Sequence, residues 1–374
     1  MSPPASAEVG PARWRLVARA IARRFQAGQS LLYRKPYSVL FIRSDMGGWV
    51  LDEEAFALER IARDLGLRSR VNLGLSPLAQ QCCHYTSQFV LADAKHFTTR
   101  QRVSIDYFHG DPAGASSFVA NYSGLKRHHP AITRVRVSHS HMQQVALEAG
   151  VEPSKVRRIP IGVDIPRFPI ADATSRAAVR RRLGLPDAAV VVGSFQKDGV
   201  GWGEGLQPKL IKGPDVLLRT LVAVKASIPE LWVLLTGPSR GFVKAGLTQA
   251  GIPFRHFAPS RYEEIGSCFH ALDAYLITSR DEGGPKSLLE AMACGIPVVT
   301  TRVGQAIDLA SMRDNAWVAE SEDVSGLAEG VSRLLGDSAL RSRLIAAARH
   351  TAEANSHAAQ RDSWAEFFRG YVEP

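Results

Sequence analysis

The chain has 374 residues, of which 45% are hydrophobic and 22% are charged, and its formal net charge is +10. This is the composition of an ordinary globular protein, long enough for two or three domains with substantial cores. No apolar run reaches the length of a membrane span, and the N-terminus lacks the uninterrupted apolar core of a secretory signal. The basic balance is compatible with an anionic ligand, nucleic acid or an anionic membrane surface, and does not choose between them.

Residues 1–35 contain a basic amphipathic pattern. Apolar residues recur at the spacing of one helix face, and arginines occupy much of the rest. Such a helix could lie on an anionic membrane surface; the alternative is that it packs against the first domain or is partly disordered. The apolar residues are Trp14, Val17, Ala18, Ile21 and Phe25, and the arginines are Arg13, Arg15, Arg19, Arg23 and Arg24.

The four cysteines have no metal-type spacing. Cys82 and Cys83 are adjacent, and neighbours of this kind rarely bridge each other, while Cys268 and Cys294 are isolated. We therefore expect four reduced, mostly buried thiols, which fits a cytoplasmic protein.

Short β-branched runs alternate with helical patterns along the first half of the chain, which we predict to form a domain over 36–168. This alternation predicts a parallel sheet covered by helices. The expected strands are 38–44, 88–94, 102–108 and 133–138, and the expected helices are 52–65 and 139–149.

A proline-rich stretch at 158–175 reads as a linker, after which the alternation restarts and predicts a second domain over 169–353. The tail from about 338 to 372 reads as helical, and we expect 354–374 to return to the first domain. Two such α/β domains leave a cleft at the carboxyl ends of their sheets, where ligands bind in these folds. The expected strands of the second domain are 189–195, 231–237, 254–258, 274–279 and 297–301.

The run "ITSRDEGGPKSLLEAMACGIPVVTTRVGQ" at 277–305 carries most of the functional information. A strand ends near Ser279, a loop carries Glu282, and Pro285 suits the first position of a helix. Glu290 lies in that helix, roughly 10 Å from Glu282 at about 1.5 Å rise per residue. Such a separation suits two carboxylates that hold different hydroxyl groups of one elongated ligand. The amides of the helix N-terminus and Lys286 lie between them and favour a phosphate, so the pattern indicates a nucleotide-sugar.

This run resembles the retaining glycosyltransferases of family 4, also described as glycosyl transferases group 1, which have the GT-B fold of two facing Rossmann-like domains. The resemblance implies that Glu282 contacts the donor sugar and that Glu290 holds the ribose hydroxyls. It also implies that the loop 301–304 faces the cleft, and it assigns donor binding to Gly283, Gly284, Pro285, Lys286, Thr301 and Gly304. The matching residues are Glu282, Gly283, Gly284, Glu290, Ala291, Met292, Ala293, Gly295, Pro297, Val298 and Val299.

Weaker matches extend the resemblance over most of the chain. Gly47 and Gly48 follow the first strand, where the family's Gly-Gly loop approaches the donor diphosphate, and glycine permits that approach. His109 ends a strand where the family often has a histidine near the donor sugar. Gly237 lies in a loop that lines the base pocket in the family. Ile161 stands where the family commonly has asparagine, so a polar role there is not expected.

The stretch "GSFQKDGVGWGEGLQPKLIKG" at 193–213 is rich in glycine but fits neither the dinucleotide fingerprint nor the Walker loop. It is either an expanded loop of the cleft that orders around a ligand or a mobile surface loop. The family has a basic pair here, which stabilises the departing diphosphate: an arginine after the strand and a lysine before a glycine. Lys212 matches the lysine, whereas Ser194 follows Gly193 in place of the arginine. We expect Lys197 to substitute for it.

These features predict a retaining glycosyltransferase that uses a UDP- or GDP-sugar, with Glu282, Lys212, Lys197 and His109 as catalytic residues and with no metal or cofactor. The resemblance suggests a glycan of the envelope or capsule as acceptor, and the basic amphipathic N-terminus is consistent with a lipid-linked one. We expect a cytoplasmic protein that could contact the inner face of the membrane through this N-terminal helix, with no nucleic-acid partner. Two alternatives remain open: a nucleotide-sugar epimerase of the same fold, and a non-catalytic basic binding protein.

Overall fold

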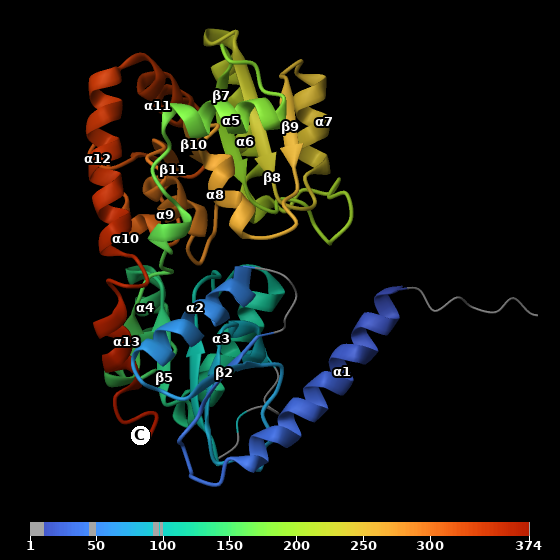
Figure 1. Cartoon of the computed structure of the whole chain (residues 1–374), viewed down its shortest axis with the longest axis vertical. Coiled ribbons are helices and arrows are strands. Elements are labelled where there is room, and N and C mark those ends of the chain that lie inside the picture. The colour runs from blue at the N-terminus through green and yellow to red at the C-terminus, as the bar shows by residue number, and fades with distance from the viewer. Residues whose placement is uncertain (1–10, 45–49, 93–96, 98–99, 374) are drawn as a thin grey trace, which may run out of the picture.

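The structure is a computed structural model that describes residues 11–44, 50–92, 97 and 100–373. It has two lobes, each built on a six-stranded parallel sheet flanked by helices (Figure 1). The N-terminal sheet has the strand order β2-β1-β3-β4-β5-β6, and the C-terminal sheet has the order β12-β11-β10-β7-β8-β9.

The N-terminal lobe contains the first six strands and the helices between them. Its strands are β1 (Leu40–Arg43), β2 (Ser69–Asn72), β3 (Cys82–Tyr85), β4 (Arg102–Asp106), β5 (Arg134–Val137) and β6 (Val156–Arg158). Its helices are α2 (Val50–Asp64), α3 (Ser116–His128) and α4 (Ser140–Glu148).

The strand expected at 88–94 is wrong, because η2 (Gln88–Ala92) is a 3-10 helix. The place in the sheet is filled by β3, which the sequence did not suggest because "CCHY" lacks a β-branched run. The η2 segment instead packs against α3, where Gly124 lies so close that a Cβ would be 2.0 Å from the Leu91 carbonyl oxygen. The apolar run here therefore belongs to a helix–helix contact, in which Leu91 is buried and Phe89 is exposed, and periodicity does not distinguish such a short run from a strand.

The C-terminal lobe contains β7 to β12. Its strands are β7 (Val190–Phe195), β8 (Leu231–Thr236), β9 (Phe254–Phe257), β10 (Ala274–Ile277), β11 (Val298–Thr301) and β12 (Trp317–Ala319). Its helices are α5 (Ala173–Leu183), α6 (Pro214–Ser227), α7 (Gly241–Gln249), α8 (Glu263–Phe269), α9 (Lys286–Ala293), α10 (Ala306–Leu309) and α11 (Val324–Gly336).

The chain passes between the lobes twice. The first crossing follows β6, and the second lies between α12 (Ser338–Ala354) and α13 (Arg361–Phe368). The two crossings run side by side, with the Val163 amide donating to the Asn355 carbonyl (3.4 Å) and the His357 amide donating to the Val163 carbonyl (3.0 Å). Beyond them α13 packs on the N-terminal lobe (Figure 1), where Trp364 and Phe367 share a core cluster with β1.

All four cysteines are unpaired and buried, as predicted from their spacing. Burial raises the pKa of the Cys268 thiol to about 11 and that of the Cys82 thiol to about 12. These thiols therefore act as small apolar core groups.

Helix α1 (Pro11–Gln29) extends away from the N-terminal lobe (Figure 1). Its C-terminal end is attached to that lobe, because Gln26 accepts a hydrogen bond from the Leu73 amide at 2.8 Å. Ile21 and Phe25 are 64% and 67% exposed, so part of the predicted apolar face is not covered by the domain. Within the described part of the chain, no helix combines the length and the hydrophobicity that crossing a membrane would require.

Candidate functional site

The loop between β10 and α9 holds Glu282 in a fixed place. The Ser279 hydroxyl donates to Glu282 Oε1 at 2.9 Å, and Lys212 Nζ donates to Glu282 Oε2. The Arg280 and Asp281 amides both donate to the Ile211 carbonyl, at 2.8 and 3.1 Å. Two of the predicted catalytic residues are thus paired at the carboxyl end of β10.

A tight turn positions Lys212. Lys212 is the last residue of the 3-10 helix η7 (Leu210–Lys212), and Gly213 follows in the left-handed region with φ of 59°. A Cβ on Gly213 would lie 1.9 Å from the Thr278 carbonyl oxygen, so this turn against the end of β10 requires glycine. The Lys212 carbonyl accepts a hydrogen bond from Gln196 Nε2 at 3.0 Å, which ties the turn to the end of β7.

Glu290 lies inside α9 and is buried. Burial raises the pKa of its carboxyl group to about 7, against the lowering effects of Lys286 and of the hydrogen bond from Tyr262. The Tyr262 hydroxyl donates to Glu290 Oε1. Glu290 is therefore a carboxyl group whose charge depends on pH near neutrality, with Oε1 already engaged.

Lys286 makes a contact between the lobes. Its Nζ is 2.8 Å from Glu54 Oε1 on α2 and 5.3 Å from the centre of the Tyr262 ring. Both charged side chains of this ion pair are about nine-tenths buried. Its predicted contact with a donor phosphate stays a prediction, since its ammonium group is engaged by Glu54 in this structure.

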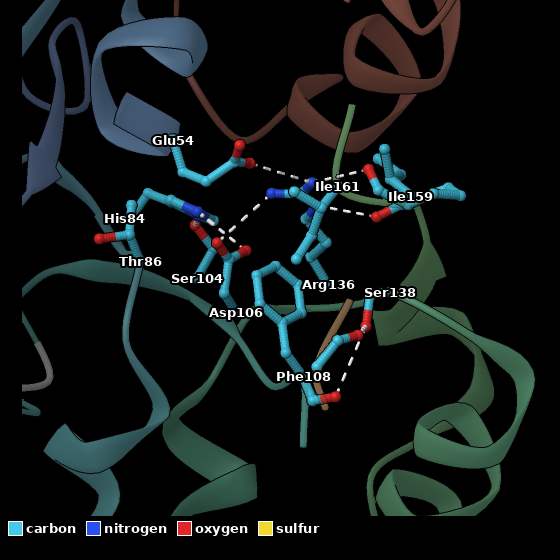
Figure 2. Close-up of polar contacts among 12 residues, drawn as sticks. Glu54, His84, Thr86, Ser104, Asp106, Phe108, Arg136, Ser138, Ile159 and Ile161 are labelled. Carbon is cyan, nitrogen blue, oxygen red and sulfur yellow. Dashed lines mark hydrogen bonds and ion pairs between the residues drawn. The ribbon is translucent and has the colours of Figure 1, made fainter. Parts of the chain in front are cut away.

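The two glycines after Glu282 lie at the interface between the lobes. A Cβ on Gly283 would lie 2.7 Å from Phe108 Cβ, and one on Gly284 would lie 2.9 Å from Gln305 Oε1. The Ser138 hydroxyl donates to the Gly283 carbonyl (Figure 2 shows Ser138 and Phe108 side by side). The loop that the sequence assigned to donor binding is thus also a contact surface for the N-terminal lobe.

Pro285 is placed one position away from the prediction. It is the residue before α9 rather than its first helical residue, with ψ of 101°. A proline restricts its own φ but leaves ψ free, so the extended ψ moves the start of the helix to Lys286.

The other predicted donor residues lie around the same loop. Thr301 is buried and its hydroxyl donates to the Ser279 carbonyl at 2.7 Å, so it supports the loop. Gly304 has φ of 53°, and a Cβ there would lie 2.7 Å from the Glu282 carbonyl oxygen. Gly237 has φ of 86° after β8 and accepts a hydrogen bond from the His256 ring at 2.7 Å. Gly47 and Gly48 lie outside the described residues.

His109 comes from the N-terminal lobe toward this site. Burial and the positive charge of Lys212 lower the pKa of His109 to about 4, so its ring is neutral at pH 7. Its backbone is held by Gln88, whose Nε2 donates to the His109 carbonyl at 2.6 Å and whose Oε1 accepts from the His109 amide at 3.1 Å. The preceding residue, Phe108, contacts Gly283 of the Glu282 loop, so His109 lies near this loop, and both Lys212 and Glu282 act on the pKa of its ring.

A buried ionic network in the N-terminal lobe adjoins the interface between the two lobes. Arg136 on β5 lies 3.4 Å from Asp106 and 3.7 Å from Glu54, and Asp106 lies 3.2 Å from the His84 ring (Figure 2). Burial tends to raise the pKa of Glu54, but Lys286 and Arg136 hold it down at about 2. The same arginine donates to the carbonyls of residues 159 and 160 at the first crossing between the lobes. Glu54 is thus an ionised group that links this network to Lys286.

The glycine-rich stretch is a folded ribbon. Its two sides pair through the Val200 amide and the Gln207 carbonyl (2.9 Å), and through the Lys209 amide and the Asp198 carbonyl (2.7 Å). The ribbon packs on the start of α7, where a Cβ on Gly205 would lie 2.3 Å from the Ser239 carbonyl oxygen. The two backbones lie so close here that a side chain would not fit, which explains part of the glycine content of the ribbon.

Sequence reasoning missed three residues of this region. Tyr262 and Glu54 escaped notice because they reach Glu290 and Lys286 across sequence separations of 28 and 232 residues. Lys209 was visible as a charge near Lys212, but its position depends on the ribbon. In the region that the structure describes, no group of three or more His, Cys, Asp and Glu side chains is arranged to hold a metal ion.

Comparison with solved structures assigns the architecture to the GT-B class. HepE from Anabaena, solved with UDP and glucose, superposes with a TM-score of 0.71 at 17% identity, covering 89% of this chain and 99% of that chain. WaaG, a glycosyltransferase involved in lipopolysaccharide biosynthesis, gives a TM-score of 0.63 at 16% identity, covering 89% and 100%. At these identities the likeness shows the fold alone, and the predicted GT-B fold is confirmed.

Residues 206–351 match the family model described as Glycosyl transferases group 1, which confirms the resemblance read from the sequence. A D-inositol 3-phosphate glycosyltransferase from Salinispora arenicola is 31% identical over 220 residues, which are 54% of this chain and 46% of the relative. A GDP-mannose-dependent mannosyltransferase from Corynebacterium glutamicum is 28% identical over 205 residues, covering 52% and 51%. The chain thus spans about half the length of these relatives. They support a transferase enzyme, while its activity and substrates are matters of proposal.

Proposed function

We propose that this protein is a retaining glycosyltransferase that moves a sugar from a UDP- or GDP-sugar to a hydroxyl acceptor. The observation that carries the proposal is the Glu282–Lys212 pair at the carboxyl end of β10, with Glu290 on the adjoining helix and with His109 of the other lobe under the electrostatic effect of both members of the pair. A paired lysine and carboxylate, helix amides and a second carboxylate in this order suit the sugar, diphosphate and ribose of one donor.

In the proposed reaction the bond between the anomeric carbon and the donor phosphate oxygen breaks, and a bond from that carbon to the acceptor oxygen forms on the same face of the sugar. The acceptor proton passes to a phosphate oxygen of the departing nucleoside diphosphate. Negative charge grows on the diphosphate, and Lys212 with the amides at the start of α9 stabilises it. Removal of one preorganised donor of this kind typically lowers the rate by about 10²–10³.

Glu282 and His109 have different tasks in this scheme. Glu282, held by Ser279 and Lys212, accepts a hydrogen bond from a donor-sugar hydroxyl. His109 is neutral, so it can exchange a hydrogen bond with the sugar without adding charge near Lys212. Because lysine and amides supply the positive charge, we propose that the reaction needs no metal, and turnover should survive a chelator.

The donor base stays open between uracil and guanine. The HepE structure was solved with UDP, whereas the Corynebacterium relative is named for its dependence on GDP-mannose. The test is a panel of UDP- and GDP-sugars scored for release of nucleoside diphosphate, followed by product mass with candidate acceptors. Free epimerised nucleotide-sugar would favour an epimerase. Binding of UDP or GDP with no turnover on any acceptor would favour a non-catalytic binding protein.

We also propose that the acceptor is an envelope or capsule glycan or its lipid-linked precursor, reached at the inner face of the membrane. Support comes from α1, whose sequence has five arginines and no acidic residue, and whose Ile21 and Phe25 are exposed. Apolar side chains beside arginines suit the surface of an anionic bilayer. The full chain should cosediment with phosphatidylglycerol vesicles more than with phosphatidylcholine vesicles. Equal binding of an Ile21→Ser/Phe25→Ser variant would contradict this role of α1.

A further inference from the structure

The base of the glycine-rich ribbon is fixed by a buried arginine. Arg240 Nη2 lies 3.0 Å from Asp198 Oδ2, and both side chains are fully buried. Arg240 Nη1 donates to the Ser194 carbonyl at 2.6 Å and to the Thr236 carbonyl at 2.9 Å. The ribbon is therefore tied to the carboxyl ends of both β7 and β8.

The far side of the ribbon is equally constrained. The Gly241 amide donates to the Glu204 carbonyl at 2.6 Å, and the Phe242 amide donates to the Gly205 carbonyl at 2.9 Å. On the return side, the Lys212 amide donates to the Lys209 carbonyl at 2.8 Å, so both lysines belong to one turn. The backbone that carries Lys209 is thus held independently of any ligand.

The Glu282–Lys212 pair carries no net positive charge, so a further cation would help to hold a diphosphate. Lys212 is the nearest cation, but Glu282 neutralises it. Lys209 is half-buried, and among the residues that the structure describes no carboxylate lies at ion-pair distance from its ammonium group. Burial, then the positive charges of Lys212 and Lys197, lower the pKa of Lys209, and its charge also acts on His109. An anion at this place would relieve the repulsion between the lysines.

Lys197 is close enough to act on Lys209, but its ammonium group is engaged by an aromatic ring. Its ammonium group lies 4.8 Å from the ring centre of Trp202, a side chain that is 67% exposed. A cation held over an exposed ring is engaged by that ring, whereas Lys209 belongs to the same turn as Lys212, the lysine that contacts Glu282.

We infer that Lys209, presented by the anchored ribbon, is the second cation that contacts the donor diphosphate beside Lys212, a role that the sequence alone assigned to Lys197. This inference rests on the proposed function, because it names a further residue for the same donor. The ligand chemistry is that of a diphosphate group, whichever base and sugar it carries.

The test measures binding of inorganic pyrophosphate, UDP and GDP by calorimetry, and turnover of the preferred nucleotide-sugar. Lys209→Ala and Lys209→Gln should each weaken binding of all three by about tenfold or more, as expected for loss of a hydrogen bond to a charged group. Added salt should weaken binding less in these variants than in the wild type. Lys209→Arg should restore most of the affinity. Lys126→Ala, which removes an exposed lysine of α3 that lies over Tyr122, is the matched control and should behave as wild type.

Two results would overturn the inference. One is wild-type affinity and turnover in both Lys209→Ala and Lys209→Gln, with melting temperatures that show folded protein. The other is a larger loss in Lys197→Ala than in Lys209→Ala. If the wild type itself binds neither pyrophosphate nor nucleotide and releases no diphosphate from any donor, the proposed function fails together with the inference.

Discussion

Protonation of Glu290 should determine how tightly the site holds a nucleotide-sugar. Ribose hydroxyls donate hydrogen bonds, so the ionised carboxylate is the form that accepts them. The pKa of Glu290 is raised from 4.5 to about 7 by burial, and the group is therefore largely protonated below neutrality. Affinity should fall as the pH falls through about 7.

The size of the effect follows from that pKa. At about pH 8 most of the carboxyl groups are ionised, whereas at about pH 6 only about one in ten is, because one pKa unit is a factor of ten in the protonation equilibrium. If binding requires the ionised form, the dissociation constant should rise about tenfold between these two values. This equals about 1.4 kcal/mol of binding free energy.

Calorimetric titration of a nucleotide-sugar, without acceptor, measures this dependence, since its diphosphate diester has no proton to titrate near neutrality. Tyr262→Phe removes the hydrogen bond that lowers the pKa of Glu290, so the midpoint should move to higher pH. Lys286→Met should move it in the same direction, because the positive charge of Lys286 also lowers that pKa. In Glu290→Gln the profile should be flat.

A flat wild-type profile would refute this reasoning. So would a profile that Glu290→Gln leaves unchanged, because the titrating group would then be another residue. Proton release on binding provides a second readout, obtained by repeating the titration at about pH 7 in buffers of different ionisation enthalpy.

Three further changes test other parts of the site. Lys212→Ala should lower turnover by about 10²-fold or more, measured as nucleoside diphosphate release; near wild-type turnover would reject its role at the leaving group. Glu54→Gln should destabilise the protein by about 3 kcal/mol, because it leaves buried Lys286 uncompensated, and Glu54→Gln/Lys286→Met should recover part of this loss in thermal unfolding. Additive losses in the double variant would contradict the coupling. Gly213→Ala should lower the melting temperature by several degrees, since its φ of 59° and a carbonyl 1.9 Å from the added Cβ both oppose a side chain; an unchanged melting temperature would contradict the turn.

Sequence patterns predicted the second lobe better than the first. Strands such as β7 and β10 are β-branched or apolar runs bounded by turns, and such runs specify a buried parallel strand. By contrast β2, "SRVN", is mostly polar and exposes Arg70, and β3, "CCHY", buries a polar histidine through partners on other elements. His84 in β3 is an example, since it is paired with Ser104 at 2.9 Å on the neighbouring strand. No local pattern shows that pairing.

In the candidate site too, sequence predicted the residues of a local motif and missed those that depend on tertiary contacts. The motif correctly predicted Glu282 in a loop and Glu290 in a helix. The two residues are only eight positions apart, so a local sequence pattern covers both. What surrounds them depends on tertiary contacts: Tyr262 against Glu290, and Glu54 against Lys286. Sequence could not supply these partners, since their separation along the chain carries no periodic signal.

Several contacts between the lobes lie on residues 283–308, a segment that includes the loop proposed to bind the donor. Phe108 and Ser138 reach Gly283, and the Ser140 amide reaches Asp308 at 2.8 Å. The Lys286–Glu54 pair lies on the same segment. A change in how closely the lobes pack should therefore also change the conformation of the Glu282 loop. Because an equilibrium shifts only through differential contacts, a donor that binds this loop also biases how closely the N-terminal lobe packs on it. Substitutions in that lobe should then change donor affinity without touching the donor.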